Sequence, residues 1–422
     1  MVRISLLLGA CALVGSNVAS TIPSTMPPPP SGVYETVPAP PSTPPKENCT
    51  CDGDNNTSAG IPMTAEFANL QRDYQMNTLA SLKGNDKCTP SNIAIRKSWD
   101  EIDNETRLDF IRAIKCLAAK PAKTDKKLAP GVVNRLDDFT YIHINQTNII
   151  HNSGYLLPWH RIFLQQFETA MREECGYKSY LPYWDNTRFS EDQTKSKVWD
   201  GSMTSFGGNG VYLENDHGPY KAILPGLVQK NFTLPKPPGT GGGCITTGPF
   251  VNFTISLGPV ALETIDPKNR FGLEPNPRCL KRNFDPKSSA GVLTWANATK
   301  IAGAPNISQH RNNMDLLWHK NSHTFVGKDG ADPFSTTNEP AFYLLHAQID
   351  RLYAIWQGQD LENRKYAIDG NRTFLGIPLE YAPDVKPSLA EIDDVMDLGL
   401  GVKPKVKETM SATDNGMCYM YA

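Results

Sequence analysis

The histidines of this chain are few, and most of them fall into two groups. The 422 residues include 8 histidines, and six of these form two triplets, His143, His151 and His160, then His319, His323 and His346. Imidazole is the commonest metal ligand, and three imidazoles without a cysteine or glutamate at ligand spacing favour copper or zinc. A lone histidine is more often a core or polar residue, but two such clusters predict two bound metal ions.

The residues around the triplets have helical spacing. Residues 159–172 are predicted to form a helix whose inward stripe is His160, Leu164, Phe167 and Met171. Two later stripes follow the same logic: they comprise Leu316, His319 and His323, then Phe342, His346, Ile349 and Tyr353. The ligand candidates are therefore expected on buried helix faces.

A zinc protease also uses two histidines four residues apart. That chemistry requires a glutamate directly after the first histidine as the general base, and here Lys320 follows His319. The sequence excludes this alternative.

Longer motifs surround the same histidines. His143 ends the segment DDFTYIH, His151 precedes LLPWHR and Glu168, and the second triplet lies in HKNSHTFVG and EPAFYLLHAQIDRLYAIWQ. These stretches, together with LPYWD, CITTGPF, NPRCL and the terminal CYMY, resemble the tyrosinase and catechol oxidase (polyphenol oxidase) family, and most closely its short secreted fungal type. The resemblance extends over about residues 61 to 422.

The resemblance implies a type-3 dicopper centre, with one copper ion on each triplet. It also implies a mainly α fold, a helical bundle with long loops and a few short strands. The implied enzyme uses O2 to convert o-diphenols to o-quinones, with ortho-hydroxylation of monophenols as a further activity of the family. Two alternatives share the dicopper chemistry: an aminophenol or hydroxyindole oxidase of pigment or secondary metabolism, and a haemocyanin-like oxygen carrier.

Some positions depart from the family pattern. Leu345 stands where many members have a further histidine before the last ligand. Lys320 stands where strong monophenol hydroxylases often carry Asn, and Arg311 lies near the position of an expected glutamate. These changes favour oxidation of diphenols over hydroxylation of monophenols.

Further residues are candidates for supporting roles. Asp350, one turn after His346, is expected either to orient a ligand imidazole or to be a surface acid of its helix. Glu168 is expected either to orient a ligand imidazole or to pair with an arginine. Lys320, Thr324 and Phe334 are candidate substrate contacts. The default roles are the core for Trp159, Tyr183 and Trp184, and the polar surface for His217 and His310.

The first 60 residues indicate an extracellular protein. Residues 1–20 have the charge and apolar run of a signal peptide, and residues 21–60 are a Pro/Ser/Thr-rich flexible arm before a catalytic domain at 61–422. No stretch is apolar enough to span a membrane. The formal net charge of −2 and the lack of a basic stripe make nucleic acid an improbable partner.

Cysteines and sequons agree with secretion. Eight cysteines remain after residue 20, enough for up to four disulfides whose pairing the spacing leaves open, and none is expected to bond to His151. Ten Asn-x-Ser/Thr sequons indicate N-glycans, although Asn145, close to His143, is expected to be unmodified.

Local signals predict further elements. Thr89 and Pro90 are expected to open a helix over residues 91–102. Asp103 is expected to cap the next helix, which ends before Pro121 and buries Leu108, Ile111, Ile114 and Leu117. Residues 187–310 are expected to be loops with a few short strands.

Overall fold

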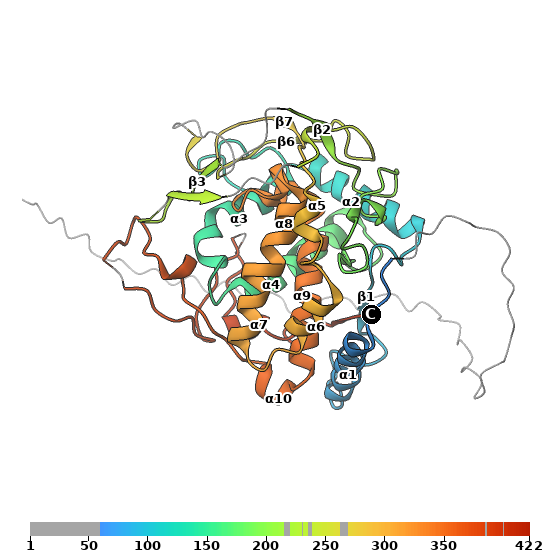
Figure 1. Cartoon of the computed structure of the whole chain (residues 1–422). Coiled ribbons are helices and arrows are strands. Elements are labelled where there is room, and N and C mark those ends of the chain that lie inside the picture. The colour runs from blue at the N-terminus through green and yellow to red at the C-terminus, as the bar shows by residue number, and fades with distance from the viewer. Residues whose placement is uncertain are drawn as a thin grey trace, which may run out of the picture. The chain divides into compact units, whose positions relative to one another are not determined.

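The computed structural model describes residues 60–422 except 215–219, 230, 235–238, 262–268, 385 and 400. The predicted signal peptide, nearly all of the flexible arm, Cys49, Cys51 and His217 lie outside these residues. Within them the fold is mainly α, as predicted (Figure 1). The helices are α1 Ala65–Ser81, α2 Asn104–Ala119, α3 Arg135–Ile150, α4 Leu156–Cys175, α5 Pro286–Ser289, α6 Trp295–Ala302, α7 Ile307–Asn313, a π-helix Met314–His319, α8 Lys320–Val326, α9 Phe342–Gly358 and α10 Leu361–Arg364.

Helix α9 is the centre of the helical region. Every one of its residues is buried, and it packs against both α1 and α4 (Figure 1). A helix that is buried all round requires neighbours on every side. Any side chain that points inward from α9 is therefore held in fixed surroundings.

Helices α3 and α4 have well-defined ends. Asn134 and Asp137 form a reciprocal capping box at the start of α3, which satisfies backbone N–H groups that would otherwise be unpaired. Helix α4 ends at Cys175 and is capped by Gly176, whose φ of 65° is left-handed and suits glycine. Phe139 of α3 meets Phe163 and Phe167 of α4 edge-on, so the two helices are joined by aromatic packing.

The strands are short and pair in twos. Strand β1 is parallel to β8, and the other pairs (β2 with β5, β3 with β4, β6 with β7) are antiparallel. Their bounds are β1 Ala94–Arg96, β2 Gly210–Tyr212, β3 Tyr220–Ile223, β4 Asn231–Leu234, β5 Gly242–Ile245, β6 Thr254–Ile255, β7 Arg278–Cys279 and β8 Tyr419–Tyr421. Most of these strands lie in the predicted loop region, which also contains α5, α6 and the start of α7.

Two local predictions are wrong. Thr89 and Pro90 begin a turn and not a helix, and the following residues form β1, because that segment pairs with the C-terminal strand β8. Asp103 does cap α2, but Leu108 is 48% exposed and Phe110 is buried in its place.

Three disulfides join the six cysteines that the structure describes. The pairs are Cys88–Cys418, Cys116–Cys175 and Cys244–Cys279. Each of these six sulfur atoms is therefore already bonded to another cysteine. Among the described residues, no helix has the length and apolar character needed to cross a bilayer.

Candidate metal centre

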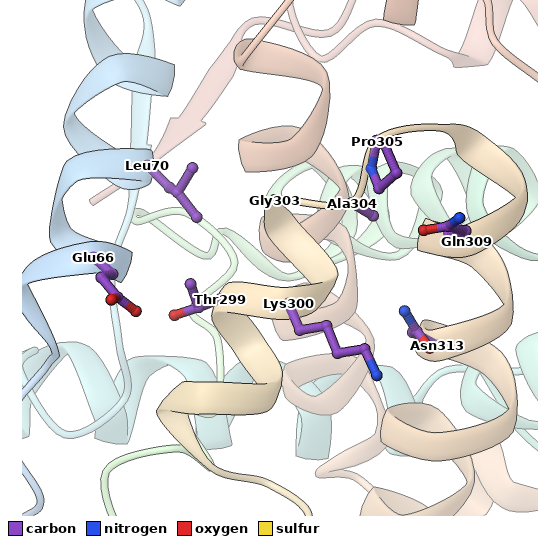
Figure 2. Close-up of a pocket in the computed structure, with 9 residues that line it drawn as sticks. All are labelled: Glu66, Leu70, Thr299, Lys300, Gly303, Ala304, Pro305, Gln309 and Asn313. Carbon is purple, nitrogen blue, oxygen red and sulfur yellow. The ribbon is translucent and has the colours of Figure 1, made fainter.

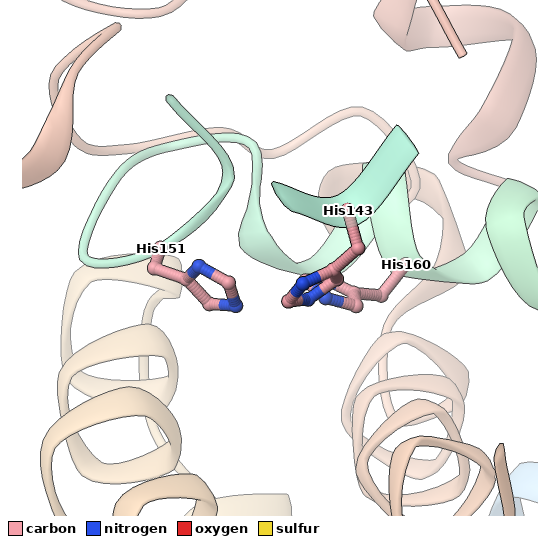
Figure 3. Close-up of side chains that lie close together, drawn as sticks. All are labelled: His143, His151 and His160. Carbon is pink, nitrogen blue, oxygen red and sulfur yellow. The ribbon is translucent and has the colours of Figure 1, made fainter. Parts of the chain in front are cut away.

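The first triplet comes from α3, the residue that ends α3, and α4. His143 is on α3, His151 caps its C-terminus and His160 is on α4. All three are buried, and one nitrogen from each ring lies within 4.8 Å of the others. Figure 3 shows the three rings turned toward one another. The sequence prediction that these residues come together is correct.

The second triplet is built on the π-helix, α8 and α9. His319 ends the π-helix, His323 is on α8 and His346 is on α9. Their candidate ligand atoms also lie within 4.8 Å of one another, and His323 is the one partly exposed ligand candidate. Leu316, which the sequence placed on the inward face, is 56% exposed, because the wider π-helical turn changes which residues point inward.

The two triplets face each other. The rings of His160 and His346 stack with centroids 4.2 Å apart, and those of His151 and His319 are nearly parallel at 5.7 Å. The ring of Phe342 packs against both sets, 5.3 Å from His143 and 4.2 Å from His346. The six histidines therefore form one centre and not two separate sites.

Hydrogen bonds on Nδ1 fix the orientation of five rings. The Nδ1–H of four rings donates to backbone carbonyls: His143 to Phe334 at 2.7 Å, His151 to Thr147 at 3.1 Å, His160 to Leu156 at 2.7 Å and His323 to Gly330 at 2.7 Å. His319 donates instead to the carboxylate of Asp315 at 3.2 Å. With Nδ1 committed, Nε2 is the nitrogen that remains available to a metal.

The free nitrogens match what a metal requires. The Nε2 atoms of His143, His160 and His319 are buried and have no hydrogen-bond partner among the described residues. A buried polar atom without a partner is rare unless an ion or water fills the site. Two facing sets of three imidazole nitrogens fit two copper ions, which imidazole ligands suit.

Burial keeps five of the ligand candidates neutral. Burial lowers the pKa of His143 to about 4. Burial, with a smaller effect of neighbouring histidines, also lowers the pKa values of His151, His160, His323 and His346. A neutral imidazole retains the lone pair that binds a metal, so these four and His143 are ready to coordinate at neutral pH.

The predicted supporting acids have other roles. Asp350 accepts hydrogen bonds from Arg161, Tyr419 and Tyr421, and His346 Nδ1 has no partner in the described chain. The expected bond between Asp350 and His346 is therefore absent. Glu168 forms an ion pair with Arg96 at 2.5 Å, which is the second of its two predicted roles.

The predicted substrate contacts are divided. Lys320 is exposed and Thr324 partly exposed, one turn apart on α8. The ring of Phe334 is 1% exposed and packs within a second apolar cluster. Its contact with the site is its backbone carbonyl, which accepts the hydrogen bond of His143 Nδ1–H. Trp159, Tyr183 and Trp184 are core residues, as predicted.

His310 was expected at the surface and is fully buried. Its Nδ1–H donates to the Ile301 carbonyl at 2.9 Å, and its ring stacks on Trp356 at 5.0 Å. It lies outside both triplets, so it is a core residue of the α6, α7 and α9 packing.

The sequence missed Asp315 as a contact of the site. It is 3% exposed, four residues before His319. An acid four residues from a histidine on a helix can contact its ring, and Asp315 has this spacing to His319. Asp350 has the same spacing to His346, and the sequence favoured Asp350 instead.

A separate groove lies between α1, α6 and α7 (Figure 2). It has a volume of about 540 Å³, and its lining includes Glu66, Leu70, Lys300 and Gln309. It contains no member of either triplet, so we assign the chemistry to the histidine centre.

Comparison with known proteins gives consistent matches. Residues 133–359 match the common central domain of tyrosinase. The tyrosinase-like protein orsC of Emericella nidulans is 38% identical over 316 residues, 72% of this chain and 85% of that protein. The N-acetyl-6-hydroxytryptophan oxidase ivoB of the same organism is 32% identical over 364 residues, 79% of this chain and 94% of that protein. A polyphenol oxidase of Thermothelomyces thermophila, solved as a point variant, superimposes with a TM-score of 0.76 at 31% identity, covering 86% of this chain and 99% of that one.

Proposed function

The chain belongs to the tyrosinase family of copper oxidoreductases, and from this we infer that each histidine triplet binds one copper ion. The further proposal is that the enzyme oxidises o-diphenols to o-quinones with O2. The observation that carries it is the pair of facing triplets, in which the Nε2 atoms of His143, His160 and His319 are buried and have no hydrogen-bond partner among the described residues. Copper, when bound, supplies the O2 activation and accepts the two electrons of each diphenol.

The protein's own residues hold the geometry and exclude water. The Nδ1 bonds fix the planes of five rings, and the stack of His160 on His346 fixes the separation of the triplets. Phe342 fills the space beside both sets. Ligand rings held in this way would present their nitrogens to bound copper ions in a fixed arrangement.

The substrate reaches the centre from the side of His323. It is the one partly exposed ligand candidate, and Lys320 and Thr324 lie on the same short helix. A phenol that enters here meets the second triplet first. Lys320 and Thr324 are therefore the proposed substrate contacts, and the buried Phe334 is not one of them.

The enzyme favours diphenols over monophenols. Hydroxylating a monophenol requires removal of its proton near the metal, and Lys320 offers three donors and no acceptor. A diphenol is oxidised more easily and makes less demand on the site.

A narrow-substrate oxidase is the second candidate. Its support is the 32% identity to a protein named N-acetyl-6-hydroxytryptophan oxidase. The loop at residues 328–339 would determine which phenols such an oxidase accepts. This loop also contacts the centre, because the Gly330 carbonyl accepts the hydrogen bond of His323 Nδ1–H.

The protein is also proposed to be secreted. The support is the signal-like residues 1–20, the ten sequons and three disulfides, which form in oxidising compartments. N-glycans and a catalytic domain at 61–422 belong to this proposal.

Copper analysis with oxygen uptake tests the function. The purified protein is assayed for copper and for O2 consumption with 4-tert-butylcatechol and 4-tert-butylphenol. About two coppers per chain and uptake with the catechol support the proposal. Two coppers without uptake on either compound favour the narrow-substrate oxidase, whereas absence of copper contradicts the ligand assignment.

A further inference from the structure

One ligand candidate has a different hydrogen-bond partner from the rest. The Nδ1–H of His319 donates to Oδ1 of Asp315 at 3.2 Å, whereas all three members of the first triplet donate to backbone carbonyls. In the second triplet, His323 donates to a carbonyl and His346 Nδ1 has no described partner. Among the described residues, a carboxylate group thus accepts a hydrogen bond from a ring of the second triplet and from no ring of the first.

The local backbone holds this acid in place. Asp315 and His319 lie within the π-helix Met314–His319, and Met314 and Trp318 on the same segment are fully buried. Single π-helical turns occur frequently at functional sites. Packing on both sides therefore keeps the carboxylate against the imidazole.

The burial of Asp315 does not by itself stabilise the fold. It is 3% exposed, and its Oδ2 has no hydrogen-bond partner among the described residues. A buried polar atom without a hydrogen-bond partner destabilises the folded protein, and more so where the group is charged. A residue with this cost needs another explanation, and its contact with His319 provides one.

A carboxylate on Nδ1–H changes the imidazole as a ligand. The carboxylate draws the Nδ1 proton, which raises electron density on the ring and makes Nε2 a stronger donor. Charge-assisted bonds of this kind are also stronger than bonds to neutral acceptors. A stronger donor binds Cu(II) more tightly.

We propose that Asp315 is a positioning residue that makes the second copper site the tighter of the two. This inference rests on the proposed function, since it requires both triplets to bind copper. It predicts unequal Cu(II) affinities within one centre, with the difference residing in one side chain.

Copper titration against a competing chelator tests the proposal. Metal-free wild-type protein is titrated with Cu(II), and two binding constants are fitted. The expected result is two unequal constants, and the Asp315→Asn variant should weaken the tighter one about 10–100-fold while leaving the other unchanged. Asn keeps the shape and one oxygen acceptor for His319 Nδ1–H, and it replaces the unpartnered Oδ2 by an uncharged NH2 group.

The control is Asp73→Asn, a carboxylate on α1 whose side chain is 49% exposed. It should change neither constant. Equal constants in the wild-type protein would overturn the inference even if the variant failed to fold, as would an Asp315→Asn variant that weakened both sites alike or neither. If the wild-type protein bound no copper at all, the proposed function would be overturned together with this inference. This outcome therefore distinguishes failure of the proposed function from failure of the inference alone.

Discussion

Arg161 Nε donates to Asp350 Oδ1 at 2.6 Å, so an ion pair joins the residue after His160 to the residue one turn beyond His346. The helices that carry His160 and His346 are therefore joined by a buried ion pair. The hydroxyls of Tyr419 and Tyr421 donate to the second oxygen of Asp350 at 2.6 and 2.8 Å. The C-terminal strand is part of the same network.

Removing one member of this network should destabilise the fold. Asp350→Ala leaves Arg161, which is fully buried, without its carboxylate. The expected loss is about 3–5 kcal/mol in the free energy of unfolding. Urea unfolding of the metal-free protein measures it. The matched control, Asp397→Ala, breaks an exposed pair with Lys403 and should change the free energy by about 1 kcal/mol or less. Equal losses in the two variants would contradict the prediction.

His310 should make the protein less stable in acid. Burial lowers its pKa from 6.5 to about 4, and its Nε2 has no described acceptor for a second proton. Between these values the unfolded chain binds the proton and the folded chain does not, so stability falls as pH falls through 6.5 toward 4. The contribution of this group at pH 5 is a loss of about 2 kcal/mol relative to neutral pH.

The His310→Asn variant measures that contribution, because an amide can still donate to Ile301 and does not titrate. Metal-free wild type should lose about 2 kcal/mol more than the variant between pH 7.5 and pH 5. All other histidines are common to both proteins and cancel in the difference. Identical pH profiles would contradict the assignment.

The cap of α2 and the inward face of α4 were predictable because they depend on residues that are close together in the sequence. Asp103 capped α2 as its side chain and position indicated, and the inward stripe of His160, Leu164 and Phe167 is buried as its spacing required. Helix period and capping depend on neighbours within a few residues. The sequence contains those neighbours directly.

The failures involve partners that are distant in sequence. Residues 94–96 form β1 because they pair with residues 419–421, which no local signal reveals. His310 is buried because α9 supplies Trp356 as a stacking partner. Asp350 was expected on His346, but Arg161 and two C-terminal tyrosines compete for its oxygens. Such competition is decided by tertiary packing.

The disulfide Cys88–Cys418 should hold the C-terminal strand in place. It spans 330 residues and lies next to the β1–β8 pair, whose Tyr421 contacts the Asp350 network. The double variant Cys88→Ser/Cys418→Ser should lose about 2–5 kcal/mol of stability. Urea unfolding measures this loss, and limited proteolysis should show faster cleavage near the C-terminus. A variant as stable and as protease-resistant as wild type would contradict the role.

Lys320 should limit monophenol hydroxylation. Its side chain is exposed and has no hydrogen bond or ion pair within the described residues, and an ammonium group cannot accept a phenol's proton, directly or through a water. Lys320→Asn adds an acceptor at this position. The expected result is about a tenfold or larger rise in the ratio of the rates on 4-tert-butylphenol and 4-tert-butylcatechol, measured by O2 uptake.

The Lys320→Met variant separates acceptor from charge, since it removes the charge without adding an acceptor. If proton removal limits the reaction, Met should leave the ratio near the wild-type value while Asn raises it. A similar rise in both variants would show that the positive charge itself opposes monophenols. An unchanged ratio in Lys320→Asn would exclude Lys320 from the control of substrate class.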